Sequence, residues 1–202
     1  MDFNLFTLPA LIIIIFASLL ILISRIWRWV LIGLAIQYIG VFILTALDWS
    51  IEMATGKLVA GWIACTVLGI AMAEALSSSV DSWMEAEHFS PSGSIFRLLT
   101  AVLVGLTVFS LTPKIVSWIP GISKAQVLGG FILIGMGVIH LGFTIQPLRV
   151  VCGLLSVLSG FEILYAAIES SILVAGLLAA ITLGLALVGA YLIVSPTMES
   201  LD

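Results

Sequence analysis

Seven apolar runs, each close to 20 residues long, follow one another along the chain with mostly short links between them. A helix needs about 20 mostly apolar residues to cross the hydrocarbon core of a bilayer. Because the runs are continuous and do not alternate, they predict helices and not the strands of a membrane barrel. We therefore expect an all-α, polytopic transmembrane helical bundle. The seven expected helices are residues 8–24, 29–47, 58–76, 95–112, 127–145, 148–168 and 172–194.

Composition supports this class of protein. Hydrophobic residues make up 62% of the chain and charged residues only 9%, whereas a soluble domain carries about a quarter charged residues. The net charge of −4 and the absence of a basic run argue against a nucleic-acid partner. The N-terminus has an acidic Asp2 and no positively charged region, so we expect the first apolar run to be retained as a helix.

The chain also repeats itself. "GLAIQYIGVFILTA" from Gly33 matches "GLLSVLSGFEILYA" from Gly153, and "VAGWIACTVLGIAMAEA" from Val59 matches "VAGLLAAITLGLALVGA" from Val174. The order of the two matches is preserved, so the second and third helices correspond to the sixth and seventh. We predict a 3+1+3 internal repeat, in which the fourth helix restores the starting side and the two halves run parallel.

This repeat divides the chain into three parts. They are a first three-helix repeat at 1–76, a polar loop and linker helix at 77–126, and a second three-helix repeat at 127–202.

Lysine and arginine near the helix ends indicate the orientation in the membrane. The face that excludes the N-terminus is expected to carry Arg25, Arg28, Arg97 and Arg149. The opposite face is expected to carry Lys57, Lys114 and Lys124. This balance favours an N-terminus outside and a C-terminus in the cytoplasm. We expect the protein to lie in the inner (cytoplasmic) membrane of the cell.

Glu162 is the foremost candidate site residue, because it lies well inside the sixth apolar run. An ionisable group at such depth is costly and usually faces the bundle interior or a water path. Two roles fit this placement. Glu162 either relays protons or, as a neutral acid, hydrogen-bonds a neighbouring helix and orders packing.

Three further residues are candidates for a proton path. His140 lies on the glycine-rich fifth helix, where it either passes protons or makes a polar contact between helices. Glu74 lies close to the end of the third helix, from which it could also snorkel to the membrane surface. Glu169 follows the sixth run, where a solvated link or the start of the seventh helix also explains an acid.

The chain shows no catalytic constellation of its own. We find no nucleotide-binding loop, no zinc motif, no cysteine cluster and no histidine pair spaced for haem, so we expect no cofactor and no metal. Cys65 and Cys152 lie in apolar runs as packing residues. Asp81, Glu85 and His88 share the spacing of one helical face, and although such ligands could bind a metal, we interpret them as a solvated amphipathic segment at the membrane surface.

The stretch "QPLRVVCGLLSVLSGFEILYAAI" resembles the K-type membrane subunit of respiratory complex I, and the whole chain resembles the longer component E of hydrogenase-4. The resemblance lies in a short polar link with an arginine, followed by a glycine-bearing helix with an acid. Aligned on Gly153 and Gly160, the family's intramembrane glutamate falls at Val157, and the seventh helix has no acid. The resemblance implies a non-catalytic membrane subunit of a proton-translocating, respiratory-chain or hydrogenase-like complex.

Three functions are therefore open. The first is a subunit of a multisubunit proton-, ion- or electron-transferring complex, with other integral membrane subunits as partners. The second is a small transporter of the SWEET type, which shares the 3+1+3 layout. All six prolines are expected at helix ends or in loops, which argues against broken transport helices. The third is a structural assembly subunit of a membrane complex.

Overall fold

The computed structural model describes residues 6–77 and 91–199, which form seven α-helices without a strand in these ranges. Six of the helices are long and apolar enough to cross a membrane, and the first is apolar but has 17 residues. The chain is a multi-pass helical membrane protein, as its apolar runs predict. The helices are α1 (Thr7–Ile23), α2 (Trp27–Thr45), α3 (Ile51–Ser77), α4 (Pro91–Trp118), α5 (Lys124–Gly142), α6 (Pro147–Ala166) and α7 (Ile172–Glu199).

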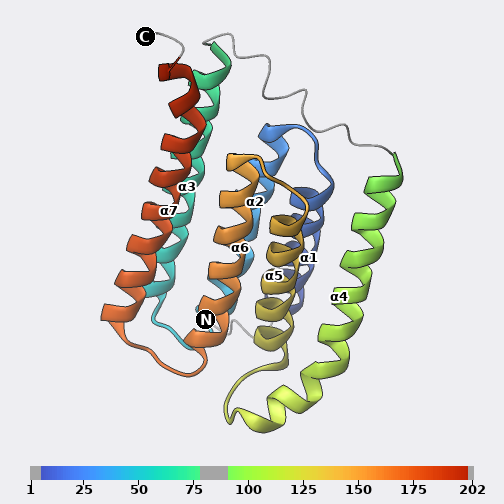
Figure 1. Cartoon of the computed structure of the whole chain (residues 1–202). Coiled ribbons are helices and arrows are strands. Elements are labelled where there is room, and N and C mark those ends of the chain that lie inside the picture. Colours follow the sequence, from blue (N-terminus) through green and yellow to red (C-terminus); the bar gives the residue numbers. More distant parts are fainter. Residues whose placement is uncertain (1–5, 78–90, 200–202) are drawn as a thin grey trace.

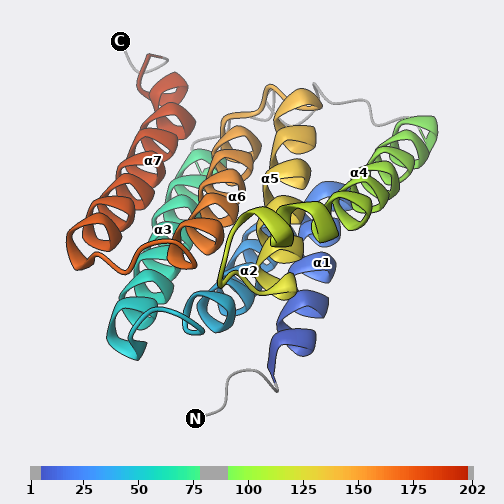
Figure 2. The same cartoon turned by 90° about the horizontal axis from the view of Figure 1, so that it is seen from below.

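Successive helices alternate in direction, so α1, α3, α5 and α7 run one way and α2, α4 and α6 the other (Figure 1). In the first half α2 packs against α1 and α3, and in the second half α6 packs against α5 and α7. Across the two halves, α1 contacts α5, α2 contacts α6 and α3 contacts α7. These pairings are those of a parallel 3+1+3 repeat, while α4 lies on the outside against α5 and α1 (Figure 2).

Matching glycines make equivalent contacts in the two halves. A Cβ on Gly33 of α2 would lie 3.4 Å from the backbone oxygen of Ala17 in α1, and one on Gly153 of α6 would lie 3.2 Å from that of Gly137 in α5. Gly153 lies 120 residues after Gly33, and Gly137 lies 120 residues after Ala17. Small residues of this kind let helix backbones approach closely in lipid.

The start of α3 differs from the sequence prediction. The third apolar run was expected to begin at residue 58, but α3 begins at Ile51. Lys57 therefore lies inside a helix, six residues after its start, and is buried in the bundle. Ile51, Met53 and Ala54 extend the apolar character of the helix before the lysine, which explains why the helix starts early.

The prolines are also not all at helix ends. Pro113 lies inside α4, five residues before the helix ends at Trp118. Proline lacks the N–H that would bond the preceding turn, and it commonly kinks a helix. The prediction that every proline falls at a helix end or in a loop was wrong for Pro113. This proline is in the linker helix α4 and not in one of the repeated helices.

Candidate functional site: a buried ion pair

The centre of the candidate site is an ion pair between α3 and α6. Lys57 Nζ lies 2.6 Å from Glu162 Oε1, and the side chains are 4% and 0% exposed. The same ammonium donates a hydrogen bond of 2.5 Å to Thr182 Oγ1 on α7. Three helices from both halves of the chain therefore meet at one charged group.

The placement of Lys57 and Glu162 in their helices lets the side chains meet. Glu162 lies four residues before the end of α6, and Lys57 lies six residues after the start of α3. At 1.5 Å per residue, both lie about 6–9 Å inside their helix ends. Since α3 and α6 are antiparallel, these ends are at the same side of the bundle (Figure 1).

Both side chains of the ion pair are buried inside the bundle. A charge at the centre of a membrane helix costs about 2.5–3.5 kcal/mol on insertion scales, and a buried pair compensates the cost of desolvation only when its geometry is good. Here the close contact and the additional hydrogen bond from Lys57 to Thr182 satisfy much of the lysine. A pair of ionisable side chains buried within membrane-spanning helices is therefore a candidate functional site.

Tyr38 of α2 forms one wall beside the ion pair. Lys57 Nζ lies 5.7 Å from the centre of the Tyr38 ring. Gly61 makes room for the ring, because a Cβ there would lie 2.5 Å from the ring carbons. Tyr38 is 1% exposed, so its ring lies beside the ion pair within the bundle.

Polar side chains continue from Glu162 along one face of α6. We call this set the α6 polar stripe, and its members are all buried: Arg149, Ser156, Ser159 and Glu162. Their spacing of seven, three and three residues keeps successive members near one another, across an arc of about 140° around the helix. From Arg149 to Glu162 the stripe covers about 20 Å along the helix axis, which is much of the thickness of a bilayer core.

Two members of the α6 polar stripe bind the first half of the chain. Gln37 Nε2 of α2 donates to Ser156 Oγ over 3.1 Å, and the serine hydroxyl lies 2.9 Å from the Cys152 carbonyl oxygen. Arg149 donates to the carbonyl oxygens of Ser24 and Arg25 at 2.8 and 3.3 Å. The stripe thus connects α6 to α2 at Ser156 and to the link between α1 and α2 at Arg149.

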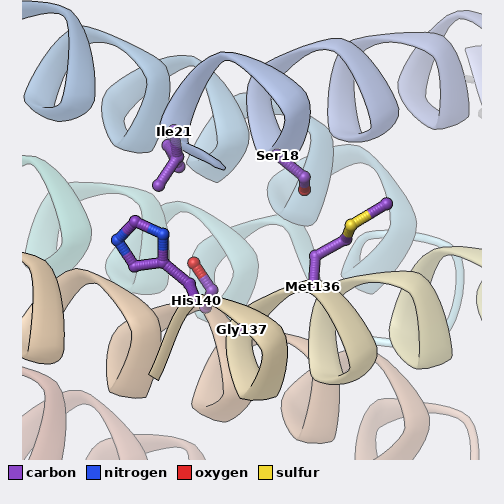
Figure 3. Close-up of a pocket in the computed structure, with 6 residues that line it drawn as sticks. Ser18, Ile21, Met136, Gly137 and His140 are labelled. Carbon is purple, nitrogen blue, oxygen red and sulfur yellow. The ribbon is translucent and has the colours of Figure 1, made fainter. Parts of the chain in front are cut away.

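His140 lies at the opposite end of the bundle from the ion pair. It is two residues before the end of α5 and 3% exposed. Residues of α1, α5 and α6 line a small pocket beside it, and Figure 3 shows Ile21 of α1 near the His140 ring and Ser18 further along the same helix. The structure does not bring His140 and Glu162 together, because they lie toward opposite ends of the neighbouring helices α5 and α6.

Glu74 and Glu169 lie apart from the α6 polar stripe. Glu74 is exposed near the end of α3, and Glu169 is exposed in the link after α6. The backbone oxygen of Glu169 accepts a hydrogen bond of 3.0 Å from Trp49 Nε1, which joins the α6–α7 link to the α2–α3 link. The structure therefore gives no buried placement to either carboxylate.

Sequence reasoning missed Lys57, Thr182 and Tyr38. The available signal for Lys57 was the apolar residues before it, which extend the third run into a helix that includes a lysine. The contact with Glu162 was not visible, because it depends on how α3 packs against α6 and α7.

In the described ranges, no group of three or more histidine, cysteine or acidic side chains could hold a metal ion. Cys65 and Cys152 are buried, free thiols. Asp81, Glu85 and His88 lie outside the described residues. Their interpretation as a solvated segment or as metal ligands stays a prediction.

Comparison of the chain with protein-family models, curated proteins and solved structures found no match in any of the three. The fold and the site define the chain as a multi-pass helical membrane protein with a charged pair buried between its two repeats.

Proposed function

We propose that the chain is a non-catalytic integral membrane subunit of a multisubunit proton- or ion-translocating complex, in which the α6 polar stripe is part of a proton path. The observation that carries this proposal is the buried ion pair between Lys57 and Glu162. Ionisable side chains within membrane helices mark ion pathways and proton relays. The resemblance to complex I-like and hydrogenase-4 membrane subunits supports the same function.

The ion pair offers two groups that can exchange a proton. In one state Lys57 is an ammonium and Glu162 a carboxylate, and transfer of one proton across their contact makes both groups neutral. Thr182 remains within hydrogen-bond distance of Lys57 in this arrangement. Protons would continue along α6 past Ser159 and Ser156, whose hydroxyl groups both donate and accept hydrogen bonds.

The proposed orientation depends on the seven lysine and arginine residues of the chain. Four arginines belong to one end of the bundle, and three lysines belong to the end that holds the N-terminus of α1. The positive-inside rule favours a cytoplasmic location for the end with the arginines and an outside location for the N-terminus, with the inner (cytoplasmic) membrane as the compartment.

Purification of the tagged chain from its own cells in mild detergent tests the assembly. We expect large redox or antiporter-like membrane subunits to co-purify with it. Recovery of the chain alone, as a monomer or homo-oligomer that moves a solute in liposomes, would instead support a small transporter and contradict the subunit proposal.

The reconstituted complex then tests the proton path. Glu162→Gln keeps the size of the side chain but cannot ionise, so proton uptake into liposomes should fall while the subunits stay together. Glu169→Gln is the matched control, because this acid is exposed in the next link, and it should leave transport unchanged. If Glu162→Gln is silent and Glu162→Leu weakens assembly, the chain is a structural subunit.

A further inference from the structure

An apolar cluster lies at the end of the bundle where α3 and α7 begin and α6 ends (Figure 1). We call it the Trp49 cluster. Three buried residues form its centre, and five partly buried residues pack against them. The members are Trp49, Ala166 and Leu178 at the centre, with Met53, Leu158, Tyr165, Val174 and Ala175 around them. The cluster thus joins the α2–α3 link to three helices.

The Trp49 cluster lies one helical turn from the ion-pair site on each of these helices. Every polar residue of the site has a member of the cluster four residues nearer the end of the bundle. The pairs are Met53 and Lys57 on α3, Ala166 and Glu162 on α6, and Leu178 and Thr182 on α7. Residues four apart share one side of a helix, and they are separated by about 6 Å along its axis. The cluster therefore lies between the ion pair and this end of the bundle on all three helices.

The Trp49 side chain is the largest of the buried members and is held by the second half of the chain. It is 4% exposed, and its Nε1 donates the hydrogen bond of 3.0 Å to the backbone oxygen of Glu169 in the α6–α7 link. A tryptophan whose N–H is paired can pack its indole ring as a large apolar body. The two links are therefore fastened to each other at the residue that fills the centre of the cluster.

We propose that the Trp49 cluster is an apolar seal that keeps water from the ion pair at this end of the bundle. The seal matters because Lys57 and Glu162 lie only about 6–9 Å inside their helix ends, and water at that depth would weaken the attraction between the two charges. The hydrogen bond to Glu169 holds the indole in the closed position. This inference rests on the fold and does not depend on whether protons move along α6.

A thiol on the inner side of the seal tests the proposal. Thr182 is fully buried beside Lys57, so Thr182→Cys places a thiol there. The thiolate is the reactive form, and a thiol that water does not reach should react slowly with a small charged thiol reagent. We expect slow labelling of Thr182→Cys in detergent while Trp49 is present.

Adding Trp49→Ala should open the seal. The labelling rate of Thr182→Cys should then rise at least about tenfold, which corresponds to about 1.4 kcal/mol in the cost of opening. Fast labelling with Trp49 in place would overturn the proposal, and so would an unchanged slow rate in Trp49→Ala. Trp118→Ala is the matched control, because it removes an exposed tryptophan at the same end of the bundle, and it should leave the labelling slow.

The two native thiols distinguish an open seal from an unfolded bundle. Cys65 lies eight residues beyond Lys57 in α3, and Cys152 lies ten residues before Glu162 in α6, so both are further from this end. They should stay unlabelled in Trp49→Ala. If either reacts, the milder Trp49→Phe decides, since it keeps an aromatic ring but cannot donate to Glu169. Its labelling rate at Thr182→Cys should lie between those of the Trp49 and Trp49→Ala chains, and a rate as slow as with Trp49 would contradict the role of the hydrogen bond.

Discussion

Lys57 of α3 and Glu162 of α6 form a buried ion pair at 2.6 Å, and each comes from a different repeat of the chain. The counterpart of Lys57 at the repeat offset of 115 is Ile172, and the counterpart of Glu162 at the offset of 120 is Phe42. The pair is therefore not duplicated. Two similar halves supply the scaffold, and each contributes a different charge to a single site.

The first prediction concerns the stability of the ion pair. Lys57→Met leaves Glu162 buried without its counter-charge, and we expect a loss of about 3–5 kcal/mol in the free energy of unfolding. Combining it with Glu162→Leu removes both charges and should recover most of this loss. Denaturant unfolding in detergent measures both effects.

Lys114→Met is the control for the loss of a lysine, because Lys114 is exposed on α4. Its unfolding free energy should change by less than about 1 kcal/mol. A similar cost for Lys114→Met and Lys57→Met would mean that Glu162 does not depend on Lys57.

The sequence predicted the seven helices well, because each apolar run is long and continuous. It also identified Glu162, since an acid inside such a run stands out against its neighbours. Lys57 did not stand out, because Thr55, Gly56 and the lysine together have the composition of a polar link. The role of Lys57 depends on Glu162, which lies far away in the chain. Helix periodicity does not predict which distant residues contact each other.

The second prediction concerns the space for Tyr38. Gly61→Ala places a Cβ 2.5 Å from the Tyr38 ring, so the ring must shift from its position beside Lys57. Overpacking of this kind costs about 1–3 kcal/mol. Thermal unfolding in detergent should show a lower midpoint.

The repeat supplies a matched control for this substitution. Gly176 is the counterpart of Gly61, and a Cβ there would meet nothing within 4 Å. Gly176→Ala should therefore keep or raise the midpoint, because alanine favours helix. Equal losses at both glycines would show that the contact with Tyr38 is not the cause.

The third prediction concerns the close contacts between α1 and α2 and between α5 and α6. A Cβ on Gly40 would lie 2.6 Å from Ile14 of α1, and one on Gly160 would lie 2.5 Å from the backbone oxygen of Gly130 in α5. Alanine at either position should lower the unfolding midpoint, more strongly at Gly160, because backbone cannot move aside as a side chain can. Gly105→Ala on α4 is the control, since nothing lies within 4 Å of it.

The fourth prediction concerns the similarity of the halves in an experimental structure. Helices α1–α3 should superpose on α5–α7 as parallel units, with Gly33 on Gly153 and Gly61 on Gly176. The equivalent contacts of Gly33 and Gly153 support this expectation. An inverted relation between the halves, or two different three-helix arrangements, would contradict the duplication.

The last prediction concerns the sides of the membrane. Cysteines at Ser79 and Ser200 should react with an impermeant thiol reagent from the same side, because the C-terminal ends of α3 and α7 lie at one end of the bundle (Figure 1). A cysteine at Asn4 should react from the opposite side, since α1 begins at the other end. The native thiols Cys65 and Cys152 are buried, so the unchanged chain provides an unlabelled background. Labelling of the Ser79 and Ser200 variants from opposite sides would mean that one of the helices between them does not cross the membrane. Labelling of the Asn4 variant from the same side as the Ser79 and Ser200 variants would mean that α1 does not span the membrane.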